Sequence, residues 1–491
     1  MAYISTRGCS PAVGIGAAIA AGLAPDGGLY VPEALPHIDP TAFAPGATLA
    51  DTAATLLAPF FTGDPLATEL PAICAEALDF PVPARPLRCD DAEVLELFHG
   101  STAAFKDVGA RFLAACLRRL HKPVAPKLTI LVATSGDTGA AVGAAFADQP
   151  GIDVVILYPD ARVSPRQAHQ LGSFGSNVHA LRVAGRFDDC QRMVKTALSD
   201  HALQAVRPLT SANSISLGRL LPQMTYYAHA SLRWWRARGT SAGCVVPTGN
   251  LGNALAAVWA RACGLPIGEV QLACNANATL PDFFSGGDYA PRAAVHTLAN
   301  AMDVGAPSNF ERLRWTLGGD GAKLRASFIA QSVDDARIRQ TIAPHAKAYG
   351  EVFCPHTATA VHLLDALRRA GDTRAWFVVA TAHPAKFPEV VEPLVGHAVP
   401  APPQLAAMLA RPSDAAPIAA DDHALRAWLL DHAERPPLSR AGSWRRSVRC
   451  RPGYGNSRPH TGRSSIEPMA LPNLAFAHLC TPDGAEPSRG R

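Results

Sequence analysis

Lysine is scarce in this chain: only seven of its 491 residues are lysine, and arginine supplies most of the positive charge. No run of eighteen apolar residues occurs either, so we expect neither a transmembrane helix nor a membrane partner. The formal net charge of +4 is too small to create a field that attracts nucleic acid. These absences give no indication of a membrane-spanning or a nucleic-acid-binding protein.

Metal-binding and disulfide patterns are also missing. The eleven cysteines are odd in number, dispersed, and never spaced as C-x-x-C. Such usage favours reduced thiols in a cytoplasmic protein and indicates no metal site. The glycine-containing turn at residues 247–253 lacks the G-K-[ST] ending of a P-loop and the spacing G-x-G-x-x-G, so it does not indicate a dinucleotide.

Short apolar runs alternate with amphipathic or alanine-rich segments through the middle of the chain. The expected strands are 128–133, 153–158, 178–183, 244–246, 270–274 and 376–380, and the expected helices are 139–147, 164–171, 188–198, 253–263 and 359–369. This alternation predicts an α/β fold with parallel sheets. Residues 1–95 are expected to form a helical entry region, and residues 433–491, rich in Pro, Gly, Ser and Arg, a disordered tail.

The segment around Lys106 is the strongest candidate for chemistry. An apolar run ends in a Gly-Ser-Thr turn, and three residues later an amphipathic helix is expected to begin. Its apolar face repeats at three- and four-residue spacings: Phe105, Val108, Phe112, Leu113, Cys116, Leu117 and Leu120. Lys106 would lie at the positive end of the helix dipole, where a lowered pKa suits Schiff-base formation. The alternative is a lysine that only extends along the surface.

Two polar turns follow expected strands and precede expected helices. The first, residues 134–139, offers backbone N–H groups and hydroxyl side chains to a carboxylate or phosphate. The second, residues 247–253, contains G-x-x-G at a helix start, which fits the phosphate of a small cofactor. In both turns the alternative is a plain helix cap, formed in the first by Asp137 or Thr138.

Two further segments carry weaker signals. Residues 211–219 combine hydroxyl, amide and guanidinium groups near a helix start, and alone they would be interpreted as a capped helix with a surface arginine. Residues 381–387 end the last expected strand, where the hydroxyl group of Thr381 can meet a ring nitrogen. Within that segment, we interpret His383 as a turn residue and Lys386 as a structural one.

Together, these five segments resemble the threonine synthase family, whose members are pyridoxal-phosphate enzymes of fold type II. The matching strings occur in the family's order: FHGSTAAFKD at 98–107, SGDTG at 135–139, NS at 213–214, GNLGN at 249–253 and TAHPAKF at 381–387. The strings at 3–8, 22–30 and 300–304 are similar too, so the resemblance covers roughly residues 1–432. It departs at Ser101, where the family commonly has proline, and in the tail.

The resemblance implies two α/β domains with parallel-rich sheets, residues 96–205 and 206–432, and a cofactor in the cleft between them. Lys106 is implied to hold pyridoxal 5'-phosphate as a Schiff base. The other implied cofactor-binding residues are Gly249, Asn250, Leu251, Gly252, Asn253, Thr381 and Asp137, with Thr381 on the pyridine nitrogen. The residues implied to bind the substrate's phosphate are Ser135, Thr138, Asn213, Ser214 and Arg219.

The reaction implied by the resemblance converts O-phospho-L-homoserine and water into L-threonine and phosphate, through γ-elimination and β-addition of water. Two alternatives remain open. A threonine or serine dehydratase would share the fold and the cofactor but lack a pocket for a substrate phosphate. A non-catalytic relative would bind the cofactor or a partner without turnover. We expect a monomer or a homodimer.

Overall fold

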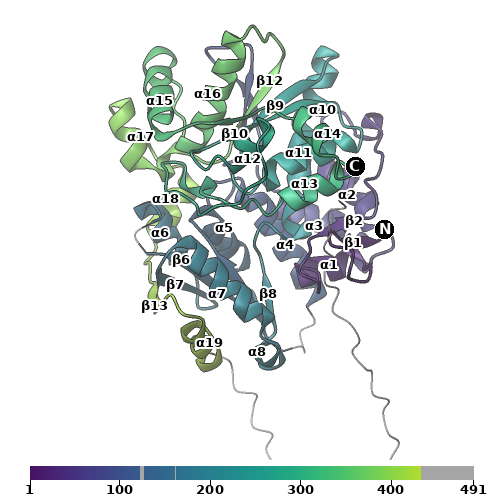
Figure 1. The fold of residues 1–491 in the computed structure, drawn as a ribbon, viewed down its shortest axis with the longest axis vertical. Helices are drawn as coiled ribbons and strands as arrows, with labels where there is room; N and C mark the ends of the chain where they lie inside the picture. The colour runs from purple at the N-terminus through teal and green to yellow at the C-terminus, as the bar shows by residue number, and fades with distance from the viewer. Residues whose placement is uncertain (122–125, 161, 433–491) are drawn as a thin grey trace, which may run out of the picture. The chain divides into compact units, whose positions relative to one another are not determined.

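The computed structural model describes residues 1–121, 126–160 and 162–432, and in these ranges three β-sheets are surrounded by helices (Figure 1). The largest sheet has, in spatial order, strands β11 (Ala330–Ser332), β10 (Ile267–Cys274), β9 (Ala242–Pro247), β12 (Trp376–Ala380), β4 (Glu93–Glu96) and β3 (Ala84–Pro86). Neighbouring strands are parallel except for β3 and β4, which form an antiparallel pair at one edge.

The second sheet is entirely parallel. Its strands, in spatial order, are β13 (Ala416–Ala419), β7 (Val178–Ala184), β6 (Ile152–Pro159), β5 (Leu128–Ala133) and β8 (Leu209–Ser211). The third sheet is the antiparallel pair of β1 (Tyr3–Ser5) and β2 (Tyr30–Pro32). Strands β9 and β12 contain only apolar residues, glycine and proline, and β5 and β6 are apolar except for Thr129 and Asp153 near their starts, because both faces of a parallel sheet are covered.

Helices cover both faces of each large sheet. Alternate residues of β9 and β12 pack either against α10 (Gln223–Arg238) and α11 (Gly252–Ala262) or against α15 (Asp335–Tyr349) and α16 (Pro355–Arg369). The five-stranded sheet packs on α4 (Lys106–Leu120) and α5 (Asp137–Phe146) on one face, and on α7 (Phe187–Ser199) and α19 (Asp422–Asp431) on the other.

The remaining helices fill the periphery. They are α1 (Ile15–Ala21), α2 (Leu49–Leu57), α3 (Leu70–Ala77), α6 (Pro165–Leu171), α8 (His201–Val206), α9 (Leu217–Leu220), α12 (Thr279–Phe284), α13 (Phe310–Thr316), α14 (Gly321–Ala326), α17 (Pro388–Val395) and α18 (Pro403–Leu409). Short 3-10 turns lie between them: η1 (Pro40–Ala42), η2 (Ala58–Phe61), η3 (Pro65–Ala67), η4 (Asn300–Met302) and η5 (Pro384–Lys386). Within the described ranges, no helix is both long and apolar enough to span a membrane.

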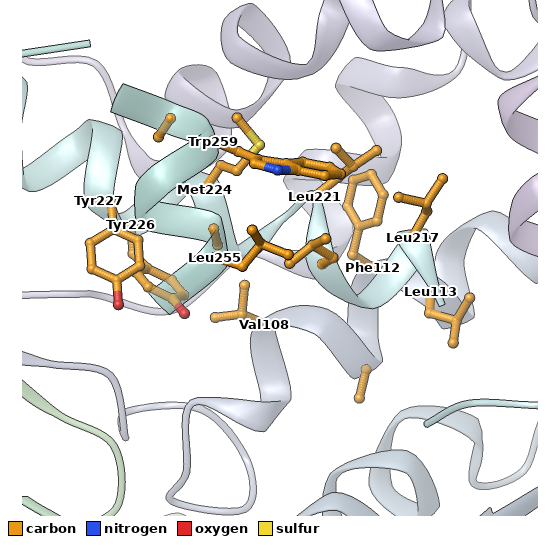
Figure 2. Close-up of a cluster of buried hydrophobic side chains, with 14 of the residues drawn as sticks. Val108, Phe112, Leu113, Leu217, Leu221, Met224, Tyr226, Tyr227, Leu255 and Trp259 are labelled. Atoms are coloured by element: carbon orange, nitrogen blue, oxygen red, sulfur yellow. The ribbon is translucent and has the colours of Figure 1, made fainter. Parts of the chain in front are cut away.

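Helix α4 is anchored by the apolar face that the sequence predicted. Val108, Phe112 and Leu113 are buried and lie beside side chains of α9, α10 and α11, including Met224 and Trp259 (Figure 2). Phe105 and Leu120, at the two ends of that face, are partly buried against the same core. The helix begins at Lys106, as predicted, so the packing of its apolar side fixes where the lysine emerges.

The fold class is confirmed, and the expected strands and helices are found within a few residues of their predicted bounds. The domain division stays a prediction, and the sheets do not follow its boundaries. Strands β8 and β13 lie in the range 206–432 but pair in the sheet of β5–β7, and β3 and most of β4 lie in the range 1–95 but join the six-stranded sheet. The predicted disordered tail lies outside the described residues.

Candidate active site

The turn before Lys106 is held by a network around Asp107. Asp107 Oδ2 accepts a hydrogen bond from the backbone N–H of Thr102 at 2.8 Å, and Oδ1 accepts one from Thr102 Oγ1 at 2.7 Å. A Cβ atom on Gly100 would lie 2.5 Å from Asp107 Oδ2, which explains the glycine. The local sequence thus closes a tight turn directly onto the first residues of α4.

Thr381 is placed beside Lys106 by backbone pairing. The Phe105 N–H donates to the Thr381 carbonyl at 2.8 Å, and the His383 N–H donates to the Ala103 carbonyl at 3.1 Å. The segments after β12 and before α4 therefore run antiparallel to each other. His383 Nδ1 caps the following turn by accepting from the Ala385 N–H at 3.2 Å, which supports its interpretation as a turn residue.

The expected lowering of the Lys106 pKa is confirmed. Burial is the main cause, the Arg219 guanidinium adds to it, and Asp137 acts in the opposite direction, so the pKa falls from 10.5 to about 8. The amine also lies 4.5 Å from the ring centroid of Phe105, a cation–π contact that favours the ammonium form. Desolvation outweighs that contact. Near neutral pH, the fraction of Lys106 present as the neutral amine is therefore much larger than that of an unperturbed lysine.

We expect this shifted pKa to make the stability of the cofactor-free protein depend on pH. Between pH 8 and 10.5 the unfolded chain holds more protons at Lys106 than the folded chain, so stability rises with pH in that window. Below pH 8 the folded protein carries the full penalty of about 3 kcal/mol. Lys106→Met should therefore raise the free energy of unfolding at pH 7 but not at pH 10.5, as measured by urea denaturation. An equal gain at both pH values would contradict the shifted pKa.

The turn between β9 and α11 forms a cradle at a helix N-terminus. A Cβ atom on Gly249 would lie 2.7 Å from the Cα atom of Met302, so only glycine fits against that backbone. Leu251 has a left-handed conformation with φ of 65°, which turns the chain into α11. Asn250 fixes the turn, since its Nδ2 donates to Ser214 Oγ at 2.5 Å and its Oδ1 accepts from the Ser308 N–H at 2.6 Å.

One donor in this cradle is left for a ligand. Asn253 Oδ1 accepts hydrogen bonds from Tyr226 and Tyr227, the second at 2.8 Å. Its Nδ2 atom is buried, and in the described part of the chain it has no hydrogen-bond partner. An orphaned donor, a glycine with no room for a side chain, and the positive end of α11 together fit a phosphate group.

The predicted cofactor residues converge on one pocket. Its walls include Lys106, Asp137, Gly249, Asn250, Leu251, Gly252, Asn253 and Thr381, and also Ser214 and Arg219 from the set predicted for the substrate's phosphate. Arg219 is fully buried, and its pKa is lowered to about 10 by desolvation, with Asp107 opposing. Its Nη1 donates to the Ala212 carbonyl at 2.6 Å, while Nε has no partner among the described residues. Arg219 is thus not the surface residue that its own segment would suggest.

The other three residues of that set lie farther out. Ser135 lines a neighbouring pocket together with Asn300, and Thr138 is partly buried on the first turn of α5. Asn213 Nδ2 donates to the carbonyl of Ala133, at the end of β5, at 3.3 Å, and its Oδ1 is unpartnered within the described ranges. The structure brings Ser214 and Arg219 next to Lys106 but not these three.

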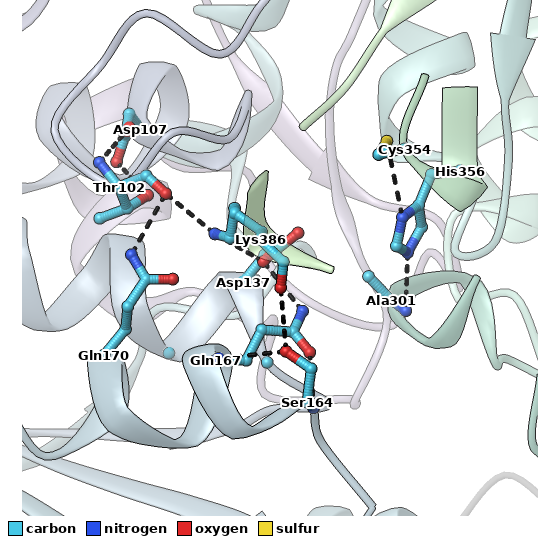
Figure 3. A network of polar contacts seen from close by, with 12 residues as sticks. Thr102, Asp107, Asp137, Ser164, Gln167, Gln170, Ala301, Cys354, His356 and Lys386 are labelled. Atoms are coloured by element: carbon cyan, nitrogen blue, oxygen red, sulfur yellow. Dashed lines mark hydrogen bonds and ion pairs between the residues drawn. The ribbon is translucent and has the colours of Figure 1, made fainter. Parts of the chain in front are cut away.

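Sequence reasoning missed His356 and assigned no role to the segment 300–302. His356 lies on α16, lines the pocket of Lys106 and accepts at Nε2 from the Ala301 N–H at 3.1 Å (Figure 3). Burial lowers its pKa to about 4, so it is neutral and can accept that bond. The only signal was a histidine behind a helix-starting proline, which is too common to single out.

Comparisons with known protein families and proteins agree along almost the whole described chain. Residues 94–384 match the family model described as pyridoxal-phosphate dependent enzyme, residues 2–78 match threonine synthase N terminus, and residues 357–428 match threonine synthase, C-terminal. Threonine synthase from Escherichia coli (strain K12) is 37% identical over 420 residues, covering 84% of this chain and 96% of the relative. Threonine synthase from Haemophilus influenzae is 36% identical over 392 residues, covering 79% and 90%.

Solved structures give the same result. The crystal structure of threonine synthase from Escherichia coli has a TM-score of 0.81 and 35% identity, and the match covers 88% of this chain and 100% of that one. The crystal structure of PLP bound threonine synthase from Brucella melitensis has a TM-score of 0.80 and 34% identity, covering 89% and 100%. The similarity therefore includes fold, sequence and nearly full length.

Proposed function

Since this chain belongs to the threonine synthase family of pyridoxal-phosphate-dependent enzymes, we propose that it converts O-phospho-L-homoserine and water into L-threonine and phosphate. The observation that carries the proposal is the content of a single pocket. It combines a lysine of lowered pKa with two separate anion sites, the cradle of α11 and the buried guanidinium of Arg219. One phosphoryl group would belong to the cofactor and the other to the substrate.

The cradle would hold the cofactor. Backbone donors at residues 249–253 and the free Nδ2 of Asn253 would bind its phosphate, Lys106 would bind its aldehyde covalently, and Thr381 would bond its pyridine nitrogen. Asp137 lines the same pocket and completes the proposed set. When bound, pyridoxal phosphate supplies an electron sink that stabilises negative charge on the substrate carbons near its amino group.

The substrate's phosphate would lie against Arg219. The guanidinium offers Nε as a buried donor without a partner in the described ranges, and Ser214 offers a hydroxyl group beside it in the pocket. Ser135, Thr138 and Asn213 are proposed to complete this subsite from the neighbouring turn and the end of β8. Their greater distance from Lys106 suits a group attached at Cγ rather than at Cα.

Lys106 would also move protons. With its Nζ atom free, Lys106 would take a proton from the substrate's Cα, release it, and then take one from Cβ; that proton could return to the substrate at Cγ after phosphate has left, before water adds at Cβ. A pKa of about 8 serves both roles, because the amine is basic enough to accept these protons and neutral often enough to start. Arg219 and Ser214 would hold the phosphate while it leaves from Cγ.

The direct test is incubation of the cofactor-loaded protein with O-phospho-L-homoserine, with phosphate and L-threonine measured together. We expect equimolar release of both, and inorganic phosphate should inhibit competitively because it occupies the Arg219 subsite. A dehydratase would instead turn over unphosphorylated threonine or serine without competition by phosphate. Turnover of neither substrate class by protein that binds the cofactor would favour a non-catalytic relative. The cytoplasmic location and the monomeric or dimeric state stay predictions.

A further inference from the structure

A second lysine is buried close to Lys106. Lys386 lies in η5, its side chain is 0% exposed, and its Nζ contacts Asp137 Oδ1 at 2.8 Å and donates to the carbonyl of Thr102 at 2.9 Å (Figure 3). An ammonium group without access to water is stable only when it is paired. Asp137 supplies the only carboxylate ion pair that the described residues give to Lys386.

One partner of Lys386, Asp137, lines the pocket of Lys106, and the other, Thr102, lies four residues before that lysine. Thr102 belongs to the turn that closes on Lys106, and Asp137 is the first residue of α5. Asp137 Oδ1 also accepts from Gln167 Nε2 at 3.0 Å (Figure 3). Gln167 Oε1 in turn accepts from Asn300 Nδ2 at 2.8 Å. The Asp137 carboxylate is therefore held in place through Oδ1 by Lys386 and Gln167.

Asp137 can interact with two amines, those of Lys386 and Lys106. It lines the same pocket as Lys106 and acts on its charge, raising the lysine's pKa against burial and Arg219. A buried carboxylate that lost its partner would turn to the nearest cation, and the ammonium form of Lys106 would be stabilised. That form cannot attack an aldehyde.

The other charged or titratable groups near the pocket do not change which amine pairs with Asp137. Arg219 from α9 faces Lys106 and stays cationic, and His356 from α16 is kept neutral by burial. Asp107 from α4 also feels the charge of Lys386, but its oxygen atoms are bonded by Thr102. His383 lines a different pocket from Lys106 and is neutral near pH 7, because burial lowers its pKa to about 4.

We propose that Lys386 is a positioning residue for the reaction: by pairing with Asp137 and bonding Thr102, it keeps the carboxylate away from Lys106 and leaves that amine free to react. The inference rests on the proposed role of Lys106. The sequence analysis interpreted Lys386 as a structural residue, and the inference gives it a part in the reactivity of the site. Through its two contacts, Lys386 also joins the turn before α4 to the start of α5, so the same side chain affects both the position and the charge of Asp137.

The test is the pH dependence of cofactor uptake by the cofactor-free protein, followed by absorbance. Lys386→Gln keeps donors for Asp137 and Thr102 but removes the charge, so the midpoint of uptake should move to higher pH by about one unit. The double variant Lys386→Gln/Asp137→Asn removes both charges, and its midpoint should return to that of the unsubstituted protein or below it. Urea denaturation of the same proteins reports the purely structural part of the pair.

Each outcome decides one question. An unchanged midpoint in Lys386→Gln, with or without lost stability, would overturn the inference and leave Lys386 a structural residue. If that variant does not fold, Asp137→Asn decides, because its midpoint must fall below that of the unsubstituted protein, and an unchanged one would overturn the inference. If the unsubstituted protein and Lys106→Ala take up the cofactor equally, the proposed role of Lys106 fails instead.

Discussion

Lys106→Ala is expected to lower turnover of O-phospho-L-homoserine by about 10⁴-fold or more, because one atom would serve as both cofactor anchor and proton carrier. The lysine begins α4, and the apolar face of that helix is buried independently of the amine. The variant should therefore fold, and loss of activity can be assigned to chemistry. The measurements are release of phosphate and threonine, together with the absorbance of the bound cofactor.

A matched control uses a lysine outside the pocket. Lys347 is exposed on α15, and Lys347→Ala should keep both the absorbance band and full turnover. If Lys106→Ala kept normal turnover, no other assignment in the pocket would hold. If it lost the absorbance band but kept turnover, the cofactor would be bound by another group.

Arg219→Met is expected to lower kcat/KM for O-phospho-L-homoserine by about 10²- to 10³-fold, because a buried charge-assisted contact with phosphate is lost. Methionine has a similar length and suits the apolar surroundings, so the cavity change is small. A second effect should appear in the same protein. Without the guanidinium, the pKa of Lys106 should rise, and the pH optimum should move to higher pH.

Two further variants separate these effects. Arg219→Lys keeps the charge but loses the planar fork, so it should restore the pH optimum more fully than the affinity for phosphate. Arg261→Met changes an exposed arginine of α11 and should alter neither. Unchanged kcat/KM and unchanged inhibition by inorganic phosphate in Arg219→Met would remove Arg219 from the substrate subsite.

Much of the secondary structure could be predicted from the sequence, because it depends on patterns of neighbouring residues. The helix after Lys106 follows from spacings of three and four residues, and it begins at the predicted residue. The buried strands β5, β6 and β12 are apolar runs flanked by turn residues, and their bounds are within two residues of the expected ones. Gly249 was also marked, although the close contact with Met302 that demands it was not visible.

The assignment of strands to sheets was harder to predict from the sequence, because paired strands are distant from each other in the chain. The strand β13 pairs with β7 across more than two hundred residues, and β4 pairs with β12 across almost three hundred. A segment's own composition says that it is a strand but not which sheet it joins. His356 was missed for the same reason, since its partner Ala301 is distant in sequence.

By itself, the sequence predicted Lys106 as the reactive lysine, residues 249–253 as an anion-binding turn, the hydroxyl-bearing turns and the order of strands and helices, because each prediction depends on residues within a few positions of one another. Only the tertiary structure decided that Arg219 is buried beside Lys106, that Asp137 is paired with Lys386, and that His356 braces the wall of the pocket. Those three facts depend on which surfaces are withdrawn from water together. Burial and pairing, which set the charge of every group in the pocket, exist only once distant segments have packed.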